Sequence, residues 1–203
     1  EDSFKSISNF CPEKTIISTG LSKWCGAGGW RLGYFILPES LKKITDTLNV
    51  LASETFSSVS APIQYAAIQA YEGDHSKYIE SSKNILKAIG TYVYENLNSN
   101  KILINKPEGG FYLMPEFITN KYNTSSEMCN DILEETGVAL LPGSDFGFSK
   151  KKMIVRLSFT DFNGRNFMQE YEKKHQIDIE LISKYAAKVV EGVDKLKKWS
   201  EKI

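Results

Sequence analysis

The segment STGLSKWCGAGGWRLGY, residues 18–34, decides how this chain is interpreted. It places Lys23 in a loop of small residues after TIIS, residues 15–18, a β-branched run that predicts a strand. An amine in such a loop can form an imine with a carbonyl if it is desolvated or lies near positive charge. Arg31 follows eight residues later. A guanidinium suits a phosphate because it is planar, always charged and bidentate, so the pair fits a phosphorylated aldehyde.

Each feature of this segment also has an ordinary structural explanation. A lysine in a loop is usually a solvated surface residue, a glycine-rich loop is often only a turn, and an arginine in a strand is often a charge at the rim. The glycines at positions 26, 28 and 29 would let backbone amides approach a ligand closely. Spacing alone nevertheless favours the ordinary explanation.

The same segment resembles the lysine signature of the class I/II aminotransferases of fold type I, which depend on pyridoxal phosphate and include enzymes like aspartate aminotransferase. Ser22-Lys23 and the run GWRLG, residues 29–33, match that signature with its own spacing. The resemblance implies pyridoxal 5′-phosphate as the cofactor, held by Lys23 as a Schiff base, with its phosphate bound by Arg31 and Ser22 beside it. One departure is Gly20, where many members have a serine that also contacts the phosphate, so that a hydroxyl contact would have to come from Ser18, Thr19 or Ser22.

The resemblance continues in order through almost the whole chain. Residues 107–117 (PEGGFYLMPEF) resemble a strand that flanks the substrate channel, and residues 136–147 (TGVALLPGSDFG) resemble a segment that ends near the active site. Residues 153–162 (MIVRLSFTDF) resemble the strand whose arginine, here Arg156, binds the substrate α-carboxylate. An arginine in so apolar a run needs an anionic partner, because unpaired burial is costly. Three aromatic residues are candidates for lining the pocket: Tyr34, Phe111 and Phe146.

The composition excludes several classes of protein. The chain has 203 residues, of which 41% are hydrophobic, so it can bury a core. Its 25 basic and 25 acidic residues balance, which argues against a nucleic-acid partner and gives no reason to expect an anionic membrane. No run of 18 apolar residues occurs, so no membrane-spanning helix is expected.

Cysteine and histidine usage argues against disulfides and metals. The three cysteines are widely spaced and form no C-x-x-C pair, and there are only two histidines. We therefore expect reduced thiols, no metal site and a cytoplasmic location. An organelle-targeting segment ahead of Glu1 would be compatible with the same thiol chemistry.

Hydrophobic periodicity and turn residues predict the local elements. A second strand is expected over residues 30–38, ended by Pro38, and the later part of the chain changes from helices to short strands. A helix with Ser125 or Ser126 as its cap and Gly137 as its stop separates the second and third of these short strands. From about Arg165 the chain is expected to be helical to its end. The other predicted helices cover residues 38–53, 60–71 and about 74–97, and the four short strands cover residues 101–107, 109–117, 138–143 and 153–159.

The resemblance implies an α/β fold that forms the C-terminal part of a fold type I aminotransferase. Residues 1–73 would supply the C-terminal part of the large cofactor-binding domain, including a remnant of its sheet. Residues 74–99 would form a bridging helix, and residues 100–203 would form the small C-terminal α/β domain. The full-length parent would be a homodimer.

The implied activity is that of a transaminase of amino acid metabolism, which moves an amino group between an amino acid and a 2-oxo acid. Two alternatives stay open. One is a lyase on the same fold, such as a C–S lyase or a relative of aminocyclopropane-carboxylate synthase, because the same lysine and arginines serve there. The other is a non-catalytic association domain in which Lys23 is vestigial. The amino donor is open too, since no arginine lies between positions 31 and 156 to bind a second carboxylate.

The first prediction concerns the isolated chain. In the family, an aspartate on the pyridine nitrogen and a tyrosine on the phenolate precede the lysine strand, and the resemblance places both ahead of Glu1. The aspartate makes the cofactor an electron sink. We therefore expect the 203-residue polypeptide with added pyridoxal phosphate to show little or no transamination when product formation from an amino acid and a 2-oxo acid is followed. Robust turnover would contradict this expectation.

Overall fold

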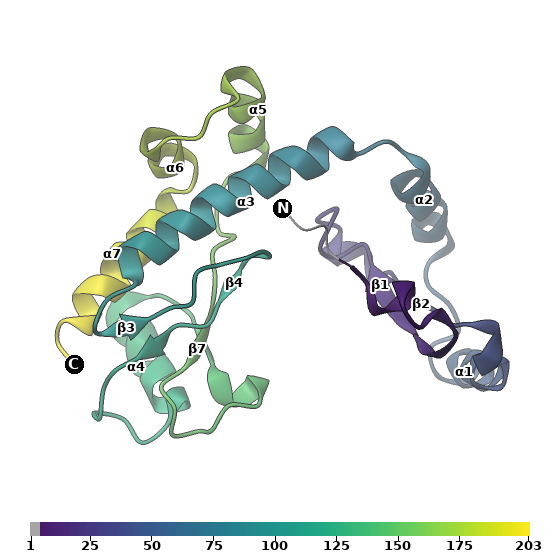
Figure 1. Cartoon of the computed structure of the whole chain (residues 1–203), viewed down its shortest axis with the longest axis horizontal. Helices are drawn as coiled ribbons and strands as arrows, with labels where there is room; N and C mark the ends of the chain where they lie inside the picture. The colour runs from purple at the N-terminus through teal and green to yellow at the C-terminus, as the bar shows by residue number, and fades with distance from the viewer. Residues whose placement is uncertain (1–4) are drawn as a thin grey trace. The chain divides into compact units, whose positions relative to one another are not determined.

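The computed structural model describes residues 5–203. The chain divides into two compact units, one ending at His75 and the other spanning Ser76–Ile203. Each contains helices and strands, which confirms the predicted α/β class (Figure 1). The assignment of these parts to a large domain, a bridging helix and a small domain stays a prediction, and each unit is described here by itself.

The first unit is built around a two-stranded antiparallel ladder. Strand β1 (Ile17–Gly20) pairs with β2 (Gly33–Ile36), in a register that runs from Ile17 opposite Ile36 to Gly20 opposite Gly33. Both strands were predicted, but β2 begins later than expected because residues 28–30 form a 3-10 turn, η3 (Gly28–Trp30). Two short 3-10 turns, η1 (Ile7–Asn9) and η2 (Pro12–Lys14), precede the ladder.

Two helices complete the first unit. A 3-10 turn, η4 (Glu39–Leu41), leads into α1 (Lys42–Thr55), and α2 (Ala61–Glu72) starts with Pro62 in its first turn, where the missing N–H costs nothing. The two predicted helices are thus confirmed within a few residues, except that the one expected from Pro38 begins in 3-10 form.

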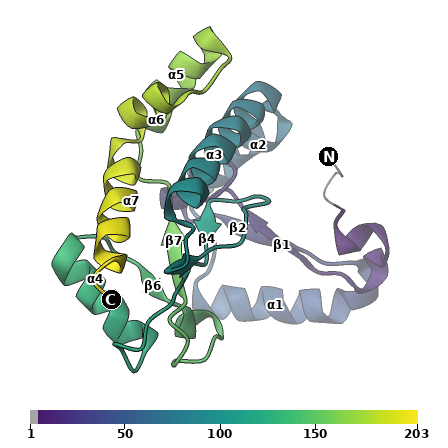
Figure 2. The ribbon, with the colours of Figure 1, turned by 60° about the vertical axis from the view of Figure 1, so that its left-hand side comes forward.

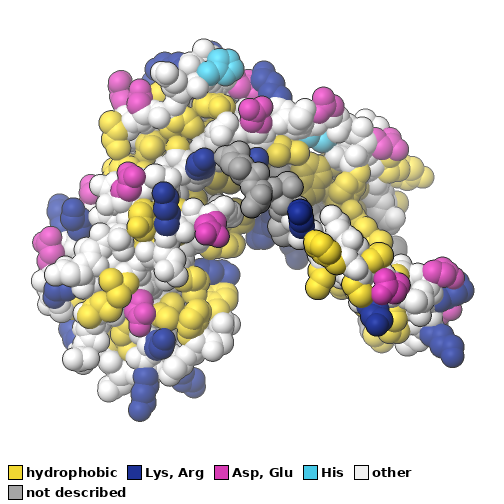
Figure 3. Space-filling view, viewed as in Figure 1, with side chains coloured by type: hydrophobic (Ala, Val, Ile, Leu, Met, Phe, Trp, Pro, Cys, Tyr) yellow, Lys and Arg dark blue, Asp and Glu magenta, His cyan; other side chains and the backbone are white. Residues whose placement is uncertain are grey.

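The first unit has a small core and an apolar surface. Its buried hydrophobic cluster is centred on Leu21, Leu32 and Ala67, while α1 buries no residue and all four residues of β2 are exposed. Figure 3 shows hydrophobic side chains on the surface of this unit. The large exposed ones include Phe10, Phe35, Val50, Leu51, Phe56 and Tyr65.

The core of the second unit forms around one face of α3 (Ser76–Leu97), which matches its predicted extent. Ile85, Ile89, Val93 and Leu97 are buried at intervals of four residues, the spacing that places side chains on one side of a helix. This face packs alongside α5 (Gly164–Lys174) and α7 (Ala187–Ser200), as the two ribbon views show (Figures 1 and 2).

The strands of the second unit are short and antiparallel. β4 (Tyr112–Leu113), β7 (Val155–Ser158) and β6 (Leu141–Pro142) form a three-stranded sheet with β7 in the middle. β3 (Ile102–Leu103) pairs with β5 (Glu116–Phe117). The single strand predicted over residues 109–117 was wrong, because Pro115 has no N–H to continue the ladder and the chain divides there into β4 and β5.

The helix boundaries of the second unit follow from specific caps. Helix α4 (Ser125–Thr136) is capped by Thr124 in a reciprocal capping box with Glu127, so the expected cap at Ser125 or Ser126 was wrong. Its predicted stop at Gly137 is confirmed, with φ of 74°. The C-terminal helical region is divided into α5, α6 (Ile179–Tyr185) and α7, and the first break is at His175, whose left-handed φ of 51° ends α5.

Two further features concern membranes and metals. Within residues 5–203, no helix has the length and apolar character needed to cross a bilayer. The same residues contain no cluster of three or more His, Cys, Asp or Glu side chains placed to hold a metal ion. All three cysteines are free thiols.

The buried face of α3 gives a prediction for stability. Ile89 is fully buried and Ile79, on the same helix, is 43% exposed. Ile89→Ala should lower the free energy of unfolding by about 2–5 kcal/mol, because it removes packed methyl groups and leaves a cavity. Ile79→Ala should change it by less than about 1 kcal/mol. Urea denaturation followed by circular dichroism makes the comparison, and equal effects would show that α3 does not pack as described.

Candidate functional site

The loop that carries Lys23 is closed at its base by two leucines. It connects β1 to β2, and the Leu21 N–H donates to the Leu32 carbonyl at 3.2 Å. The Leu21 carbonyl accepts a second bond, from the N–H of Ala27, at 3.1 Å. Leu21 and Leu32 are both buried in the small core beside α2. The loop is therefore held at its ends, whereas Ser22, next to Leu21, is half-buried and Lys23 is exposed.

The structure explains why position 20 is a glycine. Gly20 lies opposite Gly33 at the end of the ladder, and a Cβ added there would lie 2.8 Å from the Leu32 carbonyl oxygen. That distance is shorter than real Cβ contacts, and the obstacle is backbone, which cannot swing aside. A serine at this position would therefore require the backbone at Leu32 to shift. Any hydroxyl contact to a phosphate in this loop has to come from another residue, and Ser22 is adjacent to Lys23.

Arg31 has a backbone conformation that glycine would adopt more readily. It ends the η3 turn with φ of 54° and ψ of 40°, in the left-handed region. Its exposed guanidinium donates through Nη1 to the Gly28 carbonyl at 2.9 Å. A left-handed conformation costs an L-residue about 1–2 kcal/mol. Backbone strain at a residue with a charged side chain is a reason to consider a functional role for that residue, here Arg31.

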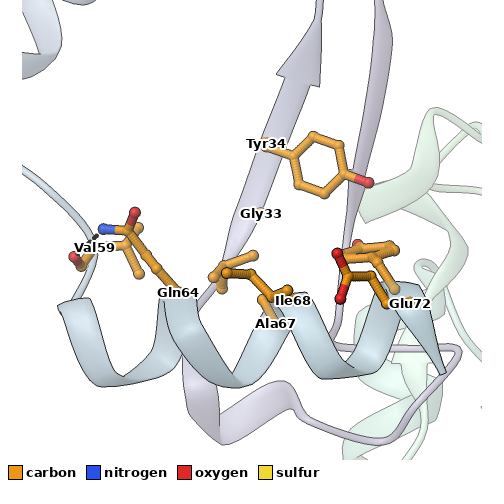
Figure 4. A pocket seen from close by; sticks show the side chains of 9 residues that line it. Gly33, Tyr34, Val59, Gln64, Ala67, Ile68 and Glu72 are labelled. Carbon is orange, nitrogen blue, oxygen red and sulfur yellow. Dashed lines mark hydrogen bonds between the residues drawn. The ribbon is translucent and has the colours of Figure 1, made fainter.

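Aromatic side chains contact one another at the Lys23 loop and at the start of β2. The Trp24 ring lies 5.7 Å from that of Tyr71 and 5.9 Å from that of His75, between centroids. Tyr34 contacts Tyr71 edge to face at 5.5 Å, and a hydrogen bond with Tyr71 raises the pKa of Tyr34. Tyr34 projects from β2 over α2 and lines a hollow of about 560 Å³ (Figure 4). Neither Lys23 nor Arg31 lines this hollow, so the expectation that Tyr34 lines the substrate pocket stays a prediction.

Arg156 lies in the second unit, on the central strand β7. It sits opposite Leu141 of β6 and is half-buried, while its neighbours Val155 and Leu157 point into the core. Its side chain therefore lies on the other face of the sheet. The guanidinium carbon is 4.5 Å from the ring centroid of Tyr112 and 4.3 Å from that of Phe146.

The sequence predicted an anionic partner for Arg156, whereas the structure places two aromatic rings against its guanidinium. Within the part of the chain that the structure describes, no Asp or Glu carboxylate forms an ion pair with this guanidinium. A cation over an aromatic face is stabilised by about 0.5–1 kcal/mol at an exposed site. The two rings thus compensate part of the cost of burial, and they leave the planar N–H edge for a ligand.

The predicted site residues fall into two groups. Ser22, Lys23 and Arg31 share one loop of the first unit, and Arg156 belongs to the second. Phe146 lies beside Arg156, whereas Phe111 packs against the main core. Tyr112 was missed as a partner of Arg156. The signal was the strand pairing, because Tyr112 lies opposite Ser158, two residues beyond Arg156 on the same face.

The loop of the first unit fits the cofactor that the resemblance implies. It offers a primary amine for an aldehyde, a guanidinium for a phosphate and the half-buried Ser22 hydroxyl. Space is also present, since a Cβ added at Gly26 or Gly29 would meet nothing within 4 Å. The donor set and the open glycine backbone therefore suit a phosphorylated aldehyde.

Comparisons with known proteins give similar sequences and structures. The family model for aminotransferase class I and II matches residues 2–167. A probable N-acetyl-LL-diaminopimelate aminotransferase from Bacillus subtilis is 33% identical over 154 residues, which cover 76% of this chain and 38% of the relative. An aspartate aminotransferase from Geobacillus stearothermophilus is 35% identical over 163 residues, covering 76% of this chain and 39% of the relative.

Comparison with solved structures also gives an aminotransferase. The crystal structure of aspartate aminotransferase from Thermotoga maritima superposes with a TM-score of 0.63 at 28% identity, over 91% of this chain and 39% of that one. The chain thus spans about two fifths of the length of the curated relatives it matches.

The left-handed conformation of Arg31 gives a prediction that separates backbone from side chain. Arg31→Gly and Arg31→Ala both remove the bond to Gly28, but only glycine removes the strain. Arg31→Gly should therefore be more stable than Arg31→Ala by about 1 kcal/mol in urea unfolding, the reverse of the usual order. If the alanine variant is the more stable one, Arg31 does not hold this conformation in solution.

Proposed function

The chain belongs to the class I and II aminotransferase family, and from this premise we propose that the protein moves an amino group between an amino acid and a 2-oxo acid. Enzymes of this family depend on pyridoxal phosphate, and the fold expected from the sequence, the C-terminal part of a fold type I aminotransferase, is confirmed. The observation that carries the proposal is the β1–β2 loop, which is closed at its base and contains both Lys23 and Arg31.

Three residues of this loop would hold the cofactor. Lys23 would bind the aldehyde covalently through Nζ. Arg31 would bind the phosphate with its guanidinium, and the Ser22 hydroxyl would add a hydrogen bond. When bound, pyridoxal phosphate supplies an electron sink that makes the substrate Cα proton acidic.

Lys23 and Arg156 would act on the substrate. The Nζ amine of Lys23 would act as the base that accepts the substrate Cα proton and later returns a proton. Arg156 would bind the α-carboxylate through its N–H edge and so orient Cα. The half-buried position of Arg156 strengthens this bond, because water competes less for the guanidinium there.

The substrates are inferred from the names of the relatives, and the assembly from the family resemblance of the sequence. The relatives named above carry the names of aspartate and N-acetyl-LL-diaminopimelate aminotransferases. No arginine lies between positions 31 and 156 of this chain. We infer an aspartate-type or broad donor range, with a lysine or a residue outside this sequence for any second carboxylate. A cytoplasmic homodimer is the proposed form, in which residues 1–73 belong to the large domain, 74–99 to the bridging helix and 100–203 to the small domain.

The function is tested on the full-length protein with aspartate, alanine and aromatic amino acids as donors. Transfer to 2-oxoglutarate with parallel initial-rate lines, the pattern of a two-step exchange, is expected. Product released equally well without a 2-oxo acid would indicate a lyase. Absence of bound cofactor in that protein would indicate an association domain instead.

Lys23 gives a prediction that does not depend on turnover. The chain is mixed with pyridoxal phosphate and reduced with borohydride, and the modified peptides are identified by mass spectrometry. Position 23 should be the dominant site of attachment, and Lys23→Ala should remove it. Lys14→Ala, an exposed lysine of the same unit, is the matched control and should leave the labelling unchanged. Labelling spread evenly over surface lysines would refute the assignment.

A further inference from the structure

We propose that Tyr112 and Phe146 are positioning residues, which fix the Arg156 guanidinium between their rings and present its N–H edge to a carboxylate. The inference rests on the proposed function, because it assumes that Arg156 receives a substrate carboxylate. It adds two residues that act through the arginine rather than on the substrate.

The two rings reach Arg156 from different elements. Tyr112 comes from β4, which pairs with β7 and places Tyr112 opposite Ser158. Phe146 comes from the 3-10 turn η5 (Gly143–Phe146), which follows β6. The guanidinium carbon lies 4.5 Å from the first ring centroid and 4.3 Å from the second, within the range of cation–π contacts. Elements on both sides of the central strand thus converge on one side chain.

The turn that carries Phe146 is tightly held. The Gly143 N–H donates to the Ile154 carbonyl at 2.7 Å, and a Cβ at Gly143 would lie 2.7 Å from the same oxygen. Gly147 closes the turn with φ of 87°, and its N–H donates back to the carbonyls of Gly143 and Ser144. The turn that carries Phe146 is therefore anchored by backbone to Ile154, two residues before Arg156 in the chain.

Packing alone does not account for these rings. Tyr112 is 38% exposed and Phe146 is 40% exposed, so neither is a core residue. Phe148, two residues further on, is equally exposed at 41%, and no contact between it and Arg156 occurs in the described chain. Tyr112 and Phe146 thus form cation–π contacts with the guanidinium, whereas Phe148, although similarly exposed, forms none in the described chain.

The chemistry points to a carboxylate as the ligand. Aromatic faces stabilise the charge of a guanidinium but do not replace the in-plane acceptors that its five N–H groups require. Among residues 5–203, Arg156 has no carboxylate partner to supply them. A planar carboxylate matches two of these donors at once. A lysine could not substitute, because its ammonium has no plane for the rings to orient.

The test uses the 203-residue chain labelled with ¹⁵N and titrated with sodium acetate, with sodium chloride as the ionic-strength control. The chain has three arginines, so the Nε–Hε region of its spectrum holds three signals, and Arg156→Lys identifies the one of interest. Acetate should shift that signal saturably. Phe146→Leu and Tyr112→Leu should each weaken acetate binding by about threefold to tenfold. Phe148→Leu should leave it unchanged, and the ring-preserving Phe146→Tyr and Tyr112→Phe should retain it.

The outcomes separate this inference from the proposed function. Acetate binding that is equal in the leucine variants and the parent chain would overturn the positioning role and leave the carboxylate role of Arg156 intact. No acetate shift of the Arg156 signal in the parent chain would overturn the inference itself. The proposed function is judged independently by the labelling of Lys23. Dispersed amide signals establish that each variant is folded, and the ring-preserving variants test the idea even if a leucine variant unfolds.

Discussion

The candidate cofactor site depends on the closure of one hairpin loop by Leu21 and Leu32. These two residues share a backbone hydrogen bond and both are buried against α2, so the loop between them is fixed at its base. Lys23 and Arg31 both lie within that closed segment. Two polar residues are thus carried on one loop whose ends are fixed by buried apolar residues, so charged residues are not needed to hold the loop in place.

The two cationic ligands are supported by different physical means. Arg31 is exposed and held by a strained backbone and one bond to Gly28, so its charge is available to a mobile, highly charged anion such as a phosphate. Arg156 is half-buried and oriented by rings, which suits a smaller carboxylate that must be held at a fixed angle. The difference suits the two proposed tasks, in which Arg31 would bind the cofactor phosphate and Arg156 would orient the substrate carboxylate.

Sequence patterns predicted the elements that depend on periodicity and missed those that depend on local backbone geometry. The long helix α3 was predicted to its last residue, because its buried positions recur every four residues. The split at Pro115 and the break at His175 were not, since each is set by one residue's dihedral or missing donor. Among the candidate site residues, Lys23 and Arg31 are close in sequence, and they could be paired because their segment matches the family signature. Tyr112 is far from Arg156, and only the strand register brings them together.

Gly20 links the end of the hairpin to the closure of the Lys23 loop. A Cβ at this position would lie 2.8 Å from the Leu32 carbonyl oxygen, so a serine there would force the backbone at Leu32 to shift. The same carbonyl accepts the hydrogen bond from the Leu21 N–H. A side chain at position 20 would therefore disturb the bond that fixes the base of the loop as well as the strand end beside it.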